Sequence, residues 1–346
     1  MQTDNLQILT ALAQPFGLKV LGFVNTRTLY ERRRRTDYWG DFMEQLLIEH
    51  IPFLQGKVQI EQIHKGYSSE SKYIVFKDDQ KFLLRTFDNK HYSSKEMEFE
   101  ALMRMKEYYV KCSRPIEMGK LEGSGIGFMI LSFIEGDDAS EVLSNISLQE
   151  QFNIGFEAGE ELLKIHKFIA PNNNITSWYE RKLKKHHEYL VKYFQQDVRI
   201  KNESKFLSFI DDNLQLMKHR PNLFQHDDFH VGNLIIKDNH LSGVIDFNRY
   251  DWGDPIHEFL KVGMFSSEVS IPFSIGQIRG YHKDSEPDDH FWRLYSLYLA
   301  MCLISSIVWI IKVKPEETNI MMNKINRVLE DHDYFRLIKP KWYYED

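Results

Sequence analysis

The sequence predicts an α+β fold with a small, β-rich N-lobe and a larger, mainly helical C-lobe. Short β-type segments gather between residues 58 and 136, and long helix-periodic segments fill the chain after Gly136. The 346 residues, of which 42% are hydrophobic, suffice for a packed core. We expect a mainly helical extension over 1–52, the N-lobe over 53–135 and the C-lobe over 136–346.

The composition argues against several classes of protein. A net charge of -6 and a pI near 6.2 do not suit a general nucleic-acid binder. Cys112 and Cys302 show no metal-ligand spacing, and the N-terminus lacks a secretory pattern, so we expect a cytoplasmic protein. The uncharged run from Leu294 to Ile311 has the minimum length of a membrane span, but serines and tyrosines dilute it. We expect it to be a core helix, and the oligomeric state stays open.

The chain before the first strand predicts a helix but no site. The segment GDFMEQLLIEHI spaces Phe42, Leu46, Leu47 and Ile51 as the apolar stripe of one helix. Four consecutive arginines at 32–35 have the charge to bind phosphate, but such runs are usually solvated. We therefore assign them no function.

Four strands and one helix are expected in the N-lobe. KDDQ is a turn between the second and third strands, so these two should pair as a hairpin. Residues 93–109 begin at a serine cap and place Glu98, Leu102 and Met105 on one face of a helix. The expected strands are residues 58–63, 71–76, 81–87 and 126–136.

Two long helices and one hairpin are expected in the C-lobe. The helical segments are residues 147–168 and 203–219. NLII and SGVIDF flank the turn-rich segment KDNHL, so they should pair as antiparallel strands. If Ile236 lies opposite Gly243, then Asn233 faces Asp246. An amide oxygen beside a carboxylate suits Mg²⁺, which leaves its other positions to phosphates and water.

Asp228 precedes this hairpin on a loop that can reach the same end of it. A carboxylate there can orient a hydroxyl nucleophile while the metal neutralises phosphate charge. The competing interpretation is a zinc or iron site made of His226, Asp227, Asp228 and His230. A zinc or iron site of this kind would not explain the oxygen ligands Asn233 and Asp246 of the hairpin.

The pattern His226-x-Asp228-x-x-x-x-Asn233, followed by Asp246 in IDF and then by GDP, is similar to a known family. It resembles the aminoglycoside phosphotransferase and choline kinase branch of the protein-kinase-like superfamily. The D-F-G and A-P-E motifs of protein kinases do not occur. Asp227 departs from the glycine that is common in this branch, and the resemblance makes His226 a structural residue.

The resemblance implies a bilobal, protein-kinase-like fold and a phosphotransferase activity. The γ-phosphate of ATP or GTP would move to a hydroxyl group of a small molecule. Asp228 would be the catalytic residue that orients this hydroxyl. Asn233 and Asp246 would bind Mg²⁺.

Further upstream, the resemblance implies two backbone contacts with the nucleotide. The loop HKGYSSESKY would cover the phosphates through Gly66, Ser68 and Ser69, and an ordinary hairpin turn is the alternative. The strand MILSFIEG would present hinge groups to the purine at Ser132, Phe133 and Ile134.

Arg85 stands where the superfamily usually has a lysine that contacts the phosphates. Its planar guanidinium is a different cation from a lysine, and an exposed strand arginine is the alternative interpretation. Glu98 shares a helix face with apolar residues, so we expect it to orient Arg85. Glu96 and Glu100 compete for this role.

The acceptor is the least determined part of the prediction. The resemblance favours an aminoglycoside, and the acids and aromatics of residues 281–290 and 342–346 would suit a cationic acceptor. A metabolic kinase for choline, homoserine or a methylthio-sugar is the alternative. Arg85 and the single glycine of the loop also leave room for a catalytically silent nucleotide-binding regulatory module.

Overall fold

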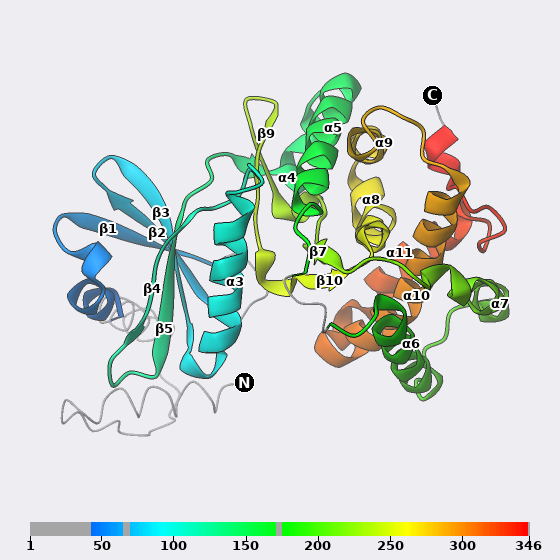
Figure 1. The fold of residues 1–346 in the computed structure, drawn as a ribbon, viewed down its shortest axis with the longest axis horizontal. Coiled ribbons are helices and arrows are strands. Elements are labelled where there is room, and N and C mark those ends of the chain that lie inside the picture. Colours follow the sequence, from blue (N-terminus) through cyan, green and yellow to red (C-terminus); the bar gives the residue numbers. More distant parts are fainter. Residues whose placement is uncertain (1–42, 65–69, 171–174, 345–346) are drawn as a thin grey trace, which may run out of the picture. The chain divides into compact units, whose positions relative to one another are not determined.

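The computed structural model describes residues 43–64, 70–170 and 175–344, in two units (Figure 1). The first unit runs to Met103 and includes Ser113–Phe133, and the second comprises Arg104–Cys112 and the chain from Ile134. One unit is built on a five-stranded sheet and the other is mainly helical. The predicted α+β class is therefore confirmed. The four arginines at 32–35 lie outside the described residues.

The sheet of the first unit is antiparallel, with strand order β1-β2-β3-β5-β4. Asp78 and Asp79 have φ of 49° and 61°, so the predicted hairpin closes through a left-handed two-residue turn. Strand β4 was not predicted, because Pro115 and Gly119 suit only an edge strand. The strands are β1 Val58–Ile63, β2 Ser71–Lys77, β3 Gln80–Asp88, β4 Pro115–Leu121 and β5 Ile126–Ser132.

Two helices accompany this sheet. The helix over 43–50 contributes Leu46 and Leu47 to the core, in agreement with the predicted stripe. Helix α3, Tyr92–Met105, ends four residues earlier than predicted. Its end is closed by a hydrogen bond from the Val110 N–H to the Met105 carbonyl, and Tyr109 is left-handed with φ of 57°.

The second unit contains the long helices of the chain. Helices α5 and α9 approach closely through two glycine pairs, Gly155 with Gly159 and Gly276 with Gly280. A Cβ atom at any of these positions would collide with the backbone of the facing helix. The helices are α4 Ala139–Val142, α5 Leu148–Ile165, α6 Trp178–Phe194, α7 Glu203–Asn213, α8 Ser267–Val269, α9 Ile271–Tyr281, α10 Asp289–Val313 and α11 Thr318–Asp331.

Helix α10 is the one described helix that is long and apolar enough to cross a membrane. In the structure 72% of its most apolar stretch is buried inside the protein. It packs against α6, α7 and α11. Helix α10 is therefore a core helix of the second unit, as the sequence predicted.

Five short strands position the candidate site. They are β6 Asp137–Asp138, β7 Leu223–Gln225, β8 Leu234–Lys237, β9 His240–Val244 and β10 Asp251–Gly253. The predicted register of the β8–β9 hairpin is wrong by one residue, because Gly243 pairs with Ile235 and not with Ile236. A two-residue turn and a bulge next to Ile236 set this register. Asn233 consequently lies opposite Ile245, whose N–H donates to the Asn233 carbonyl at 3.0 Å.

Candidate active site

The loop between β7 and β8 is organised by His226. This side chain is fully buried, and its Nε2 lies 2.9 Å from the Ile245 carbonyl oxygen. Its Nδ1 accepts a hydrogen bond from the Asp228 N–H at 3.3 Å. Both ring nitrogens are therefore engaged with the backbone. These contacts agree with the structural role that the resemblance implied for His226, and they leave neither ring nitrogen available to a metal.

Asp228 is held as a carboxylate by a lysine that the sequence did not suggest. Lys261 Nζ lies 2.7 Å from Asp228 Oδ1, and Arg249 Nε lies 3.8 Å from Oδ2. Burial opposes ionisation, but Lys261, His230 and Arg249 outweigh it and hold the pKa of Asp228 at about 2. The group is a charged acceptor of hydrogen bonds at neutral pH and a weak base.

Asn233 and Asp246 come together at the end of the β8–β9 hairpin, although not directly opposite one another. The Asn233 side chain donates from Nδ2 to the Asp228 carbonyl at 2.9 Å, which leaves Oδ1 as the atom that can meet a cation. Asp246 directly follows Ile245 and is left-handed, with φ of 67°. The donor set is one amide oxygen and one carboxylate, and it fits Mg²⁺.

A zinc or iron site is not supported at this loop. No group of three or more His, Cys, Asp or Glu side chains in the described part of the chain is arranged to hold a metal ion. His230 also contacts the loop itself, because its Nδ1 accepts from the Gly232 N–H at 3.1 Å. Burial lowers the pKa of His230 to about 4, so its ring is neutral at pH 7.

Asp227 connects the loop to helix α6. Its φ of 57° is left-handed, which explains why glycine is common at this position in the branch. Its Oδ1 lies 3.4 Å from His257 Nδ1, and His257 Nε2 lies 2.5 Å from Lys182 Nζ. Burial raises the pKa of Asp227 to about 6, in spite of Lys261, and burial holds the pKa of His257 well below its usual value.

In the first unit, Arg85 lies in a buried network of four charges. It is 4% exposed, so the exposed-strand interpretation is wrong. Its Nη1 lies 2.5 Å from Glu98 Oε1 and its Nη2 lies 2.6 Å from Glu70 Oε2. Lys95 bridges the same two carboxylates. The sequence predicted Glu98 but missed Glu70 and Lys95.

The charges of this network stabilise one another. Burial opposes ionisation of Glu70, but Arg85 and Lys95 outweigh it and lower its pKa. The pKa of Arg85 is raised by Glu98 and Glu70 against the effect of burial. The competing acids Glu96 and Glu100 are exposed, so of the three candidate glutamates on α3 Glu98 is the one that pairs with Arg85.

The predicted backbone contacts with the nucleotide are placed only in part. Gly66, Ser68 and Ser69 lie outside the described residues. The Ser132 N–H donates to the Arg114 carbonyl at 2.8 Å, and the Phe133 N–H donates to the Lys81 carbonyl at 3.4 Å. Of the three predicted hinge residues, all of which lie in the described part of the chain, Ile134 is the one whose N–H forms no hydrogen bond within the protein.

The stretches expected to attract a cationic acceptor are largely occupied. Asp284 and Glu286 pair with Arg279, and Asp288 caps helix α10 through the Phe291 N–H. Trp342 and Tyr343, from the carboxyl end, are also buried. These acids form ion pairs or cap a helix, and these rings are part of the packed interior.

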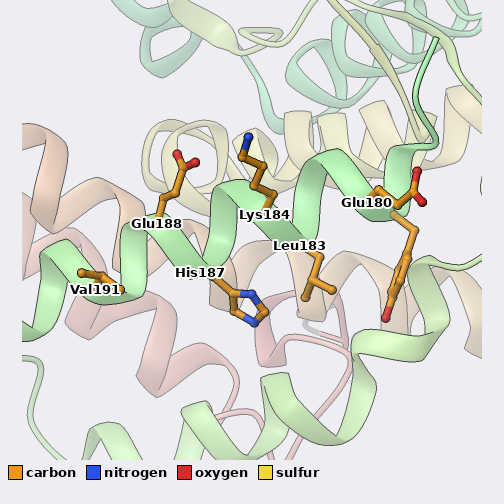
Figure 2. Close-up of a pocket in the computed structure, with 7 residues that line it drawn as sticks. Glu180, Leu183, Lys184, His187, Glu188 and Val191 are labelled. Carbon is orange, nitrogen blue, oxygen red and sulfur yellow. The ribbon is translucent and has the colours of Figure 1, made fainter. Parts of the chain in front are cut away.

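A surface hollow of about 500 Å³ lies along α6 and is separate from the predicted site residues (Figure 2). Its labelled side chains all belong to one helix and include Leu183, Lys184 and His187. They line a face of α6 other than the one that Lys182 shares with buried Trp178 and His186. None of these side chains was predicted to take part in catalysis.

Known proteins share the sequence pattern and the fold of this chain. The model of the phosphotransferase enzyme family (APH) matches residues 59–295. No curated protein matches the sequence. The chain is similar to a thermostable mutant of aminoglycoside phosphotransferase APH(4)-Ia in a ternary complex with ADP and hygromycin B, with a TM-score of 0.62 and 12% identity over 83% of this chain and 97% of the other.

Two further solved structures show the same likeness. The gentamicin complex of APH(2")-IIa has a TM-score of 0.58 and 15% identity over 89% of this chain and 97% of that one. The GDP complex of aminoglycoside 2'-phosphotransferase-IIIa has a TM-score of 0.62 and 13% identity over 84% and 98%. The protein-kinase-like fold is thereby confirmed. With the family model covering more than half of its length, the chain belongs to the phosphotransferase enzyme family.

Proposed function

We propose that this phosphotransferase moves the γ-phosphate of ATP or GTP to a hydroxyl group of a small molecule in the cytosol. Asp228 orients the hydroxyl, and Asn233 and Asp246 hold Mg²⁺. When bound, the metal neutralises charge on the phosphates. Arg85, oriented by Glu98, steadies the nucleotide.

The ion pair between Lys261 and Asp228 is the observation that most supports this proposal. A carboxylate with a pKa of about 2 is a poor proton acceptor, but it accepts a hydrogen bond from a hydroxyl at any physiological pH. Phosphoryl transfer depends mainly on positioning and charge neutralisation, so an orienting carboxylate is what the reaction needs. Family membership favours this enzyme over a silent regulatory module.

The nucleotide side of the proposal has support from related structures. The APH(4)-Ia neighbour holds ADP, and the 2'-phosphotransferase-IIIa neighbour holds GDP, so both purines are candidates. The same neighbours make aminoglycosides the first acceptor class to test, and small metabolites with a hydroxyl group are the second. At 12–15% identity the likeness extends to the fold.

Thermal denaturation with nucleotide and metal tests the proposal directly. A ligand that binds only the folded state raises the melting temperature, and at 100 times its dissociation constant it adds about 2.7 kcal/mol. We expect ATP or GTP to stabilise the protein more with Mg²⁺ than without it, and expect Asp246→Asn to remove the difference. Equal shifts with and without Mg²⁺ would show that Asn233 and Asp246 do not bind the metal.

A further inference from the structure

Several cationic side chains lie beside the catalytic loop. Asp227 and Asp228 interact with four cationic side chains, in a chain whose net charge is -6. The cations are Lys182, Lys185, Arg249 and Lys261. Two further carboxylates act on these groups, because Glu258 raises the pKa of Asp227 and Asp251 opposes the lowering of the Lys182 pKa. The charges are therefore close to balanced in sum, and the cations differ in whether a carboxylate pairs with them.

Two of these cations are not neutralised by the protein. Lys261 forms its salt bridge with Asp228, whereas neither Lys182 nor Lys185 has a carboxylate within ion-pair distance among the described residues. The nearest polar atom to the Lys182 ammonium is His257 Nε2, at 2.5 Å. The other nitrogen of that ring lies 3.4 Å from Asp227, so a single imidazole separates Lys182 from the catalytic loop.

Lys182 is also held in place by aromatic rings. Its Nζ lies 5.6 Å from the ring centroid of Trp178 and 6.0 Å from that of Tyr298. These rings are buried, and the Trp178 Nε1–H donates to the Tyr298 hydroxyl at 2.9 Å. Burial, followed by the like charge of Lys185, lowers the pKa of Lys182 to about 8. An anion bound between the two lysines would remove this electrostatic cost.

We propose that the acceptor oriented by Asp228 carries an anionic group, a carboxylate or a phosphate ester, which Lys182 and Lys185 bind. The inference rests on the proposed phosphotransferase function and specifies the substrate class of the same site. A polycation such as an aminoglycoside would be repelled by these lysines. The acids that would attract it, Asp284 and Glu286, are already paired with Arg279.

Helix α6 supplies a matched control. Lys184 is two positions from Lys182, so its side chain points to a different face of the helix. Lys184 is exposed and lines the surface hollow of Figure 2. Replacing it by methionine removes the same charge from the same helix without touching the loop.

The test measures binding of small probes to the complex of the protein with Mg²⁺ and AMP-PNP, by calorimetry. Glycerate, glycerol 3-phosphate and glycerol share a diol and differ in the group at the other end, which is a carboxylate, a phosphate ester or a neutral hydroxymethyl group. Hygromycin B and gentamicin supply the cationic class. We expect an anionic probe to bind and glycerol not to bind. Lys182→Met and Lys185→Met should each weaken the anionic probe about ten-fold, with AMP-PNP affinity unchanged and Lys184→Met behaving as wild type. The anionic probe with the higher affinity shows whether the anionic group of the acceptor is a carboxylate or a phosphate ester.

Four outcomes would overturn the inference while leaving the proposed function intact. The inference is wrong if the anionic probes bind no better than glycerol. It is also wrong if the aminoglycosides bind more tightly than either anion. Weaker AMP-PNP binding in Lys182→Met would assign the lysine to the nucleotide. A lowered melting temperature with unchanged affinities would make it a structural partner of Trp178. Failure of the wild type to bind AMP-PNP with Mg²⁺ would instead contradict the proposed function itself.

Discussion

Replacing Lys261 by methionine removes the nearest cation to Asp228, and the structure gives the size of the effect. Lys261 Nζ lies 2.7 Å from Asp228 Oδ1, and the two side chains are 15% and 16% exposed. A pKa of about 2 in place of 3.8 corresponds to about 2 kcal/mol of stability. Lys261 is the largest favourable contributor, with His230 and Arg249 behind it. We expect a double-mutant cycle with Asp228→Asn to give a coupling energy of about 1–2 kcal/mol.

The effect should depend on pH in a defined direction. The pKa of Asp228 is lower in the folded protein than its ordinary value of 3.8, so its carboxylate stabilises the fold fully above that value. This contribution is lost as the pH falls from 3.8 towards 2. The part of the difference in free energy of unfolding between wild type and Lys261→Met that comes from Asp228 should therefore shrink as the pH falls below about 4.

Urea titrations followed by tryptophan fluorescence can measure both quantities, since the chain has six tryptophans. The control is Lys324→Met, which breaks a more exposed pair with Glu268 and should cost at most about 0.5 kcal/mol. A coupling energy below about 0.3 kcal/mol, or a difference that does not change with pH, would refute the assignment of Lys261 to Asp228.

Three further predictions concern the two units, two of them the first unit and one the second. Arg85→Ala leaves buried carboxylates without their main partner and should cost about 3–5 kcal/mol in urea denaturation. Nucleotide affinity should fall in Glu98→Gln but not in Glu96→Gln, whose side chain is exposed; equal affinities would exclude Glu98 from the nucleotide site. Gly276→Ala forces a Cβ atom against the backbone of α5 and should cost about 1–3 kcal/mol. Glu160→Ala, on the exposed side of α5, should leave the melting temperature unchanged, and equal stabilities would contradict the close packing of α5 and α9.

Much of the local structure was predictable because its signals are short-range. Strand β1 has the predicted bounds Val58–Ile63, and the turn at Asp78 and Asp79 closes the expected hairpin. The loop from His226 to Asn233 was predictable for the same reason, because the residues whose spacing resembles the family pattern lie within eight positions of one another. Strand β4 was not, since an edge strand with proline and glycine has no periodic signal.

The partners of the site residues were not predictable, because they come from distant segments. Lys261 lies 33 residues after Asp228, and no pattern within the chain links the two. Glu70, the residue before β2, likewise pairs with Arg85 on β3, and Lys95 on α3 pairs with Glu70 and Glu98. The register of the β8–β9 hairpin depended on a bulge, which shifts the pairing by one residue and leaves no clear mark in the sequence.

The central claim is that Asp228 orients the acceptor while Asn233 and Asp246 hold the metal, and Asp228→Asn tests it most directly. The substitution keeps the size of the side chain and removes its charge. Calorimetry should show Mg²⁺–nucleotide binding close to that of wild type, while transfer to an acceptor that the wild type phosphorylates falls by about 10² to 10⁴. Asp246→Asn should instead weaken the metal-dependent binding. Unchanged turnover in folded Asp228→Asn would contradict the account.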